Sequence, residues 1–282
     1  MTQQIDAHQH FWQIARGDYD WMSDAVAAIR HDTLPSDLAP HLRAHGISGT
    51  VVVQAAATVA ETEFLLGLAT ETPFIKGIVG WVDLASPDAP DTLHRLAKHS
   101  KFKGIRPMLQ DIAETDWILR PEIQSNLQHL ARLGLRLDAL IQPRHLPTLL
   151  TLAEAHPTLP IVIDHCAKPL IAGGADAGDE WRSGMARLAA LPNLYCKLSG
   201  LAIEAGPGWS ADSLAPIAAH ILTHFGSERV IWGSDWPVLN LVGDYDQLRA
   251  VTAELLAPLS PADRAQVLGG TAQRFYGLDA TP

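Results

Sequence analysis

The chain has 282 residues, of which 47% are hydrophobic and 18% are charged. This composition is typical of a folded globular protein and excludes an intrinsically disordered chain. Acidic residues outnumber basic residues by 31 to 21, giving a formal net charge of −10, and because such a surface repels phosphate backbones we expect no nucleic-acid partner.

No apolar stretch approaches the roughly 20 residues that a membrane helix requires, so we expect no membrane partner. The N-terminal segment has neither a basic start nor an apolar stretch of signal-peptide length. The 2 cysteines are too few for a disulfide scaffold. These features predict a cytoplasmic protein, and the sequence carries no signal for its oligomeric state.

Short apolar runs recur along the chain, and longer amphipathic segments separate them. Several runs are rich in valine and isoleucine, which is typical of strands buried on both faces of a parallel sheet. The eight runs span residues 4–10, 50–54, 74–81, 102–107, 135–141, 160–165, 193–200 and 229–235.

The segments between these runs carry helical periodicity. After Pro35, Leu38 and Leu42 fall on one helical face, and Gly46 ends the segment. Alternating strands and helices imply right-handed parallel crossovers. No glycine-rich phosphate loop follows the first run, so eight such units favour a closed barrel over an open sheet. We therefore predict an α/β fold, a single (β/α)₈ TIM-type barrel domain over residues 1–282. Similar helical segments lie at residues 58–68, 127–134, 149–157 and 260–278.

Polar residues gather at the C-terminal ends of the predicted strands, where barrel active sites are built. The first run ends in His8 and His10, the fourth contains Arg106, the sixth ends in His165 and the eighth ends in Asp235. Residues at i and i+2 of a strand face the same way, so the first two histidines can converge on one point. One histidine near a strand end is usually structural, but this combination favours a reactive site.

Four motifs carry a resemblance to a known family. They are similar to the amidohydrolase-2 branch of the amidohydrolase superfamily, and within it to the sugar-acid lactonases, such as the L-fuconolactonases and L-rhamnonolactonases. The resemblance extends from residue 5 to about residue 278. The motifs are DAHQHF at residues 6–11, IDHCAKP at 163–169, CKLSG at 196–200 and WGSDWP at 232–237.

The resemblance implies a site that can hold one divalent metal ion, zinc or manganese, on His8, His10, His165 and Asp235. Metal-dependent members of the superfamily place a further ligand, a carboxylated lysine or a histidine, on strand four or five. The fifth run offers Asp138 instead. We therefore expect that a metal is dispensable for activity.

Lactone hydrolysis needs a base for water, stabilisation of the carbonyl oxyanion and help for the leaving alkoxide. Asp235 is the expected base. Arg106, which matches a substrate-facing arginine of the family, or a metal would polarise the carbonyl. His165 would donate to the carbonyl or orient the water.

Five further residues are candidates for substrate binding. The amide of Gln54 ends the second run, and Lys197 and Ser199 alternate on the seventh and so share a face. Trp12 and Trp236 adjoin site residues, and an indole suits the C–H face of a sugar ring. We expect the partner to be a small sugar lactone (L-fuconolactone-like, L-rhamnonolactone-like or D-galactonolactone-like) that is opened to its aldonic acid.

Two alternatives stay open at this stage. One is a metal-dependent hydrolase or decarboxylase of an aromatic-derived acid or lactone, whose carboxylates would call for several arginines, whereas the strand ends show only Arg106 clearly. The other is an inactive barrel that binds a ligand or partner, which would have to explain the complete set of histidines and aspartate.

Overall fold

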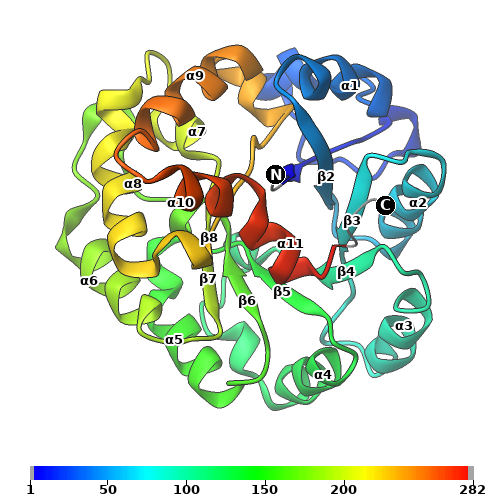
Figure 1. Ribbon diagram of the computed structural model, residues 1–282. Coiled ribbons are helices and arrows are strands. Elements are labelled where there is room, and N and C mark those ends of the chain that lie inside the picture. The colour runs from blue at the N-terminus through cyan, green and yellow to red at the C-terminus, as the bar shows by residue number, and fades with distance from the viewer. Residues whose placement is uncertain (1–2, 279–282) are drawn as a thin grey trace.

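The eight apolar runs form eight parallel strands that pair in sequential order from β1 to β8 (Figure 1). The computed structural model describes residues 3–278, so residues 1–2 and 279–282 of the predicted domain range lie outside the described residues. The prediction of a (β/α)₈ barrel is confirmed. The strands are β1 (Gln4–Gln9), β2 (Ile47–Val53), β3 (Ile75–Gly80), β4 (Phe102–Ile105), β5 (Arg136–Ala139), β6 (Ile161–Ile163), β7 (Leu194–Leu198) and β8 (Val230–Trp232).

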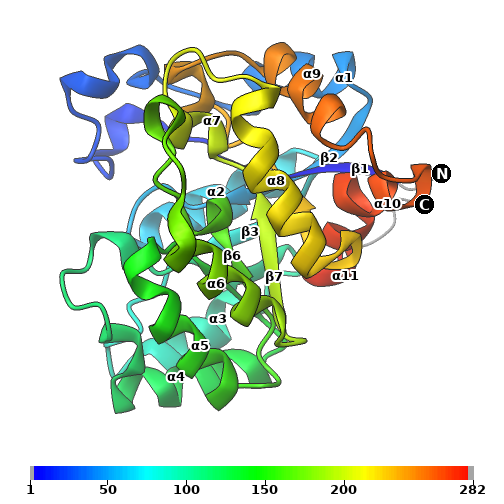
Figure 2. The same ribbon diagram turned by 90° about the vertical axis from the view of Figure 1, so that its left-hand side faces the viewer.

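Helices surround the ring of strands, and α11 lies across its middle (Figure 1). Figure 2 places α10 and α11 at one end of the barrel and the segment that follows β1 at the other. Among the helices that the structure describes, none combines the length and the apolarity needed to cross a membrane. The helices are α1 (Pro35–Ala44), α2 (Val59–Glu71), α3 (Ala89–Leu96), α4 (Pro121–Arg132), α5 (Leu146–Ala155), α6 (Gly178–Ala189), α7 (Leu201–Ala205), α8 (Ala211–Phe225), α9 (Tyr245–Leu255), α10 (Pro261–Ala265) and α11 (Thr271–Tyr276).

Strand residues alternate between two separate apolar clusters. Val51 and Val53 belong to the cluster that includes Phe275 and Tyr276 of α11, whereas Val52 packs in the larger cluster with the outer helices. This alternation follows from the two-residue period of a strand. The barrel is therefore filled by its own side chains and plugged by α11 at the end opposite the strand C-termini.

The sixth strand is shorter than predicted. β6 ends at Ile163, and each residue from His165 to Lys168 has a positive φ of 51–60°. The prediction that the sixth run stays extended through His165 is therefore wrong. A left-handed turn here is unfavourable for residues with a Cβ atom, so tertiary contacts and not local sequence preference must select it.

Candidate active site

The site forms where the barrel closes between β1 and β8. Closure depends on two backbone hydrogen bonds, from His10 N to Trp236 O and from Asp235 N to His8 O, each 2.8 Å. A Cβ atom on Gly233 would lie 2.5 Å from His8 Cβ, so only glycine allows the two segments to approach this closely. The same contacts that close the barrel thus bring Asp235 to the two histidines.

A buried carboxylate, Asp6, holds this junction. Its Oδ1 accepts from Ser234 N at 2.9 Å, and its Oδ2 accepts from Ser234 Oγ at 2.6 Å and Tyr245 Oη at 2.9 Å. Burial raises the pKa of Asp6, although the hydrogen bonds from Ser234 and Tyr245 oppose the rise. The carboxylate fixes the residue immediately before Asp235 and so restricts where Asp235 can point.

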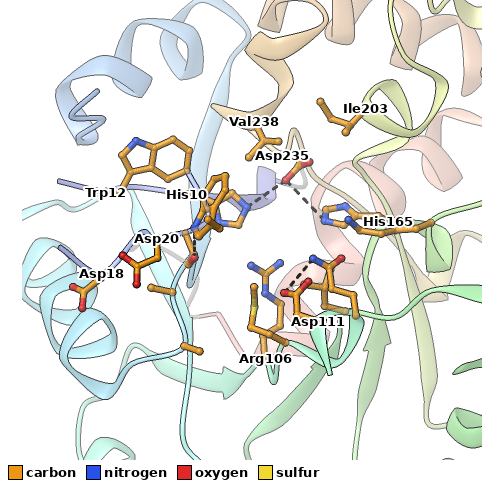
Figure 3. Close-up of a pocket in the computed structure, with 18 of the residues that line it drawn as sticks. His10, Trp12, Asp18, Asp20, Arg106, Asp111, His165, Ile203, Asp235 and Val238 are labelled. Atoms are coloured by element: carbon orange, nitrogen blue, oxygen red, sulfur yellow. Dashed lines mark hydrogen bonds and ion pairs between the residues drawn. The ribbon is translucent and has the colours of Figure 1, made fainter. Parts of the chain in front are cut away.

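The imidazoles of His10 and His165 face the carboxylate of Asp235 (Figure 3), and that of His8 approaches it as a third. Asp235 Oδ1 lies 3.3 Å from His10 Nε2, 3.7 Å from His8 Nε2 and 3.9 Å from His165 Nε2. Burial by itself raises the pKa of Asp235, but His165, His10 and His8 outweigh it and hold the pKa below its ordinary value. Asp235 is therefore ionised at neutral pH, the state in which it can accept a proton.

The donor set around Asp235 fits a divalent metal. His10 Nδ1–H donates to Val53 O at 2.7 Å, which leaves the lone pair of a neutral His10 on Nε2, facing the carboxylate oxygen. A cation bound between these two atoms satisfies both. Ligand atoms of His8, His10 and Asp235 lie within 4.8 Å of one another, and imidazole and carboxylate are ligands that Zn²⁺ accepts.

His8 is a weaker ligand candidate because cations contact both of its ring nitrogens. Lys197 Nζ lies 3.1 Å from Nδ1, and Arg106 Nη1 lies 3.3 Å from Nε2. Burial and the charge of Lys197 hold the pKa of His8 well below its ordinary value, so the ring is neutral. A neutral imidazole accepts at one nitrogen only. A metal on His8 Nε2 would have to displace the guanidinium.

His165 reaches the site from the left-handed turn after β6. Its Nδ1 lies 3.0 Å from Ser199 Oγ, and burial lowers its pKa to about 4. At neutral pH the ring is uncharged, with Nε2 directed toward Asp235. Gly200 allows this packing, because a Cβ atom there would lie 2.3 Å from His165 Nδ1. Ser199 therefore orients His165.

Arg106 is held at the base of the cavity by Gln54. Arg106 Nε donates to Gln54 Oε1 at 3.1 Å, and Nη2 donates to Gln54 Oε1 at 2.8 Å and also to Gln54 O. Nη1 lies 3.4 Å from Asp164 Oδ2. We expected the Gln54 amide to face a substrate hydroxyl. In the structure its oxygen instead accepts hydrogen bonds from the guanidinium group of Arg106.

Lys197 lies beneath the site, fully buried within the barrel. Its Nζ contacts Asp164 Oδ1 at 3.1 Å and Asp138 Oδ2, and Tyr276 Oη donates to Asp138 Oδ2 at 2.7 Å. Burial opposes ionisation of Asp164, but Lys197 outweighs it and the pKa of Asp164 is well below its ordinary value. Asp138 is thus engaged in a buried ion pair, away from the donors that face Asp235.

A cavity of about 460 Å³ opens above these residues, and its wall includes His10, Arg106, His165 and Asp235. In the described part of the chain, five of the predicted site residues do not line it: His8, Gln54, Trp236, Lys197 and Ser199. His8 still reaches Asp235 from behind the wall. We expected Lys197 and Ser199 to face the substrate together. Instead, Lys197 lies beneath His8 and Ser199 lies behind His165.

The aromatic surface of the cavity differs from the expected one. Trp12 lines it but is completely buried, and Trp236 packs against Phe11. The indole that reaches solvent is Trp21, which is 42% exposed and packs edge-on against Trp12. Trp21 was missed because it follows no strand; its only sequence signal is the aromatic and acidic run at residues 18–21.

A buried glutamate, Glu61 of α2, supports the cavity wall. Its carboxylate accepts from Ala55 N at 3.0 Å and Ala56 N at 2.9 Å, and Ala55 O accepts from Trp21 Nε1 at 2.8 Å. Both alanines line the cavity. Burial raises the pKa of Glu61 to about 7. The wall that carries Trp21 thus depends on a carboxylate that titrates near neutral pH.

A parallel barrel with histidines after its first and sixth strands and an aspartate after its eighth defines the class of this protein. The family model described as amidohydrolase matches residues 5–278. The chain therefore belongs to the amidohydrolase family, as its motifs predicted.

Relatives match along nearly the whole chain. A protein of Burkholderia ambifaria named L-fucono-1,5-lactonase is 47% identical, and the match covers 99% of this chain and 97% of the relative. A second protein of that name, from Burkholderia multivorans, is 34% identical over 97% of this chain and 96% of its own. A crystal structure of an amidohydrolase from Burkholderia multivorans with bound zinc has a TM-score of 0.91 and 35% identity, covering 98% of this chain and 100% of that one.

We predict that Glu61→Gln makes the protein less sensitive to alkaline pH. The folded-state pKa of about 7 lies above the ordinary 4.5, so the folded state holds this proton more tightly. Its contribution to stability is complete below about pH 4.5 and is lost as pH rises through 7. The melting temperature of the variant minus that of the wild type should therefore be more positive at pH 8 than at pH 5.

The exposed Glu63 of the same helix supplies the matched control. Glu63→Gln should leave the pH dependence of the melting temperature close to that of the wild type. An equal temperature difference at both pH values for Glu61→Gln would contradict the assignment of a titrating Glu61.

Proposed function

We propose that this protein hydrolyses the ester bond of a sugar lactone of the L-fucono-1,5-lactone type to give the aldonic acid. The observation that carries the proposal is an ionised Asp235 next to His10 and to the neutral imidazoles of His8 and His165, on the wall of a cavity of about 460 Å³ that Arg106 also lines. Two full-length relatives named L-fucono-1,5-lactonase support the substrate class.

The chemistry follows from the positions of these groups. Asp235 accepts a proton from a water whose oxygen attacks the lactone carbonyl carbon. Arg106 donates to the carbonyl oxygen and stabilises the oxyanion. When the ring C–O bond breaks, the proton on Asp235 passes to the departing ring oxygen, which becomes a hydroxyl group. His165, neutral and oriented by Ser199, aligns the water or donates to the carbonyl.

His10 and Asp235, with His8 and His165 nearby, would hold a divalent ion such as zinc or manganese. When bound, such an ion supplies Lewis-acid polarisation and a more acidic water. Arg106 Nη1 stands 3.3 Å from His8 Nε2 and already supplies a fixed positive charge there. We therefore propose that the metal is dispensable for turnover.

The charges that line the cavity favour a neutral substrate. Carboxylates outnumber fixed cations, so an aromatic di- or tricarboxylate would be repelled, whereas a neutral polyhydroxylated lactone would not. This distribution supports the sugar lactone over the aromatic-derived acid. The carboxylates are Asp18, Asp20, Asp111, Glu204 and Asp235, and the cations are Arg106 and Lys168.

A substrate panel tests the function. L-fucono-, L-rhamnono-, D-galactono- and D-arabinono-lactones should include at least one good substrate, and δ-valerolactone and butyrolactone should be opened on the order of 10² times more slowly or worse, because a site that pairs polar groups with hydroxyls rejects analogues that lack them. Proton release gives the rates. Inactivity on every sugar lactone, with turnover of an unsaturated aromatic-derived lactone, would contradict the proposal and favour a hydrolase of aromatic-derived lactones.

Removing the base should affect turnover far more than folding. Asp235→Asn keeps the shape of the side chain but cannot accept the proton, so kcat should fall by a factor on the order of 10² to 10⁴ while KM stays similar. Circular dichroism and the melting temperature control for folding. Near-normal turnover would remove Asp235 from the mechanism.

Chelation tests the role of the metal. Because the guanidinium competes for His8, prolonged dialysis against a strong chelator should remove bound metal, as measured by elemental analysis, and leave at least about half of the lactonase activity. Complete loss that stoichiometric Zn²⁺ or Mn²⁺ restores would show that the metal is required.

A further inference from the structure

The left-handed turn after β6 presents two side chains to the cavity instead of one. It has the three-residue period of a 3₁₀ turn, in which positions i and i+3 lie one above the other. His165 and Lys168 stand at these positions and both line the cavity, whereas Cys166 and Ala167 are completely buried. A strand would have placed Lys168 on the face opposite His165.

Contacts with β7 and α6, and one hydrogen bond within the turn, hold this turn. Cys166 Sγ donates to Lys197 O at 3.3 Å, and Trp181 Nε1 donates to Cys166 O at 2.9 Å. Lys168 N donates to His165 O at 2.8 Å. The backbone of Lys168 is therefore held in the same turn that positions His165.

Lys168 meets a carboxylate on the cavity wall. Its Nζ lies 3.6 Å from Glu204 Oε1 of α7, and the two side chains are 24% and 19% exposed. In the described part of the chain, this is the only polar partner of Lys168 Nζ, and both Lys168 and Glu204 line the cavity. Burial raises the pKa of Glu204, Lys168 opposes this rise, and the charge of Asp235 adds to it.

We propose that Lys168 and Glu204 form the hydroxyl-recognition pair of the site: the ammonium group donates to one substrate hydroxyl, and the carboxylate accepts from another. This inference rests on the proposed lactonase function and deepens it by naming residues that select polyhydroxylated lactones. A cation and an anion 3.6 Å apart can bridge neighbouring hydroxyls, because each hydroxyl both donates and accepts.

The alternative role for Lys168 is a general electrostatic one. A charge that only stabilised the oxyanion would speed up every lactone by the same factor. A hydroxyl-binding group instead favours the substrates that carry the hydroxyl, because its loss removes a contact that the unsubstituted lactone never makes. The two roles are separated by comparing substrates.

The test combines side-chain substitutions in the protein with removal of single hydroxyl groups from the substrate. Lys168→Met and Glu204→Gln are assayed on the best sugar lactone, on its single-deoxy analogues and on δ-valerolactone. The ratio of kcat/KM for the sugar lactone to that for δ-valerolactone should fall at least about 30-fold in Lys168→Met. The change should appear mainly in KM. One deoxy analogue should be penalised in the wild type but not in that variant.

Lys98→Met, an exposed lysine after α3, is the matched control and should leave the ratio unchanged. Equal loss on all substrates, or an unchanged ratio in folded Lys168→Met and Glu204→Gln, would overturn the inference while leaving the lactonase function intact. A wild type that opens no sugar lactone would instead refute the proposed function itself. Thermal melts confirm that each variant is folded.

Discussion

Closure of the sheet between β1 and β8 is the constraint on which the site depends. Two backbone hydrogen bonds, each 2.8 Å, join His8 and His10 to the segment around Asp235. Asp6 reinforces them by binding Ser234 through both carboxylate oxygens. An open sheet would separate the imidazoles from the carboxylate. Barrel stability and catalytic geometry therefore share the same contacts.

Features that follow from local sequence patterns, such as the strands, could be predicted from the sequence. Apolar runs predicted the strands, and the positions of His8, His10 and Asp235 near strand ends predicted that these three side chains lie together. The turn that begins at His165 could not be predicted, because a positive φ at non-glycine residues is selected by distant partners such as Lys197 O. The roles of Gln54 and Lys197 could not be predicted for the same reason, because each is set by contacts with residues far away in the sequence.

Charge is arranged in two layers within the barrel. Below the site, Lys197 is enclosed with Asp138 and Asp164 at zero exposure, and a buried ion of either sign would be strongly unfavourable alone. Above it, Arg106 and Asp235 line the cavity. Lys197 within the lower layer and Arg106 above it together offset the two carboxylates, and the lower layer contacts His8 and Arg106 from below.

The turn after β6 is strained, and this strain has a structural consequence for the cavity. Four consecutive residues with positive φ carry a penalty of about 1–2 kcal/mol each, and buried contacts of Cys166 and Trp181 must offset it. An extended strand end would avoid this penalty and still present His165. What it could not present is Lys168 on the same side, three residues later. The strained turn therefore places His165 and Lys168 on one wall of the same cavity, which an extended strand end would not do.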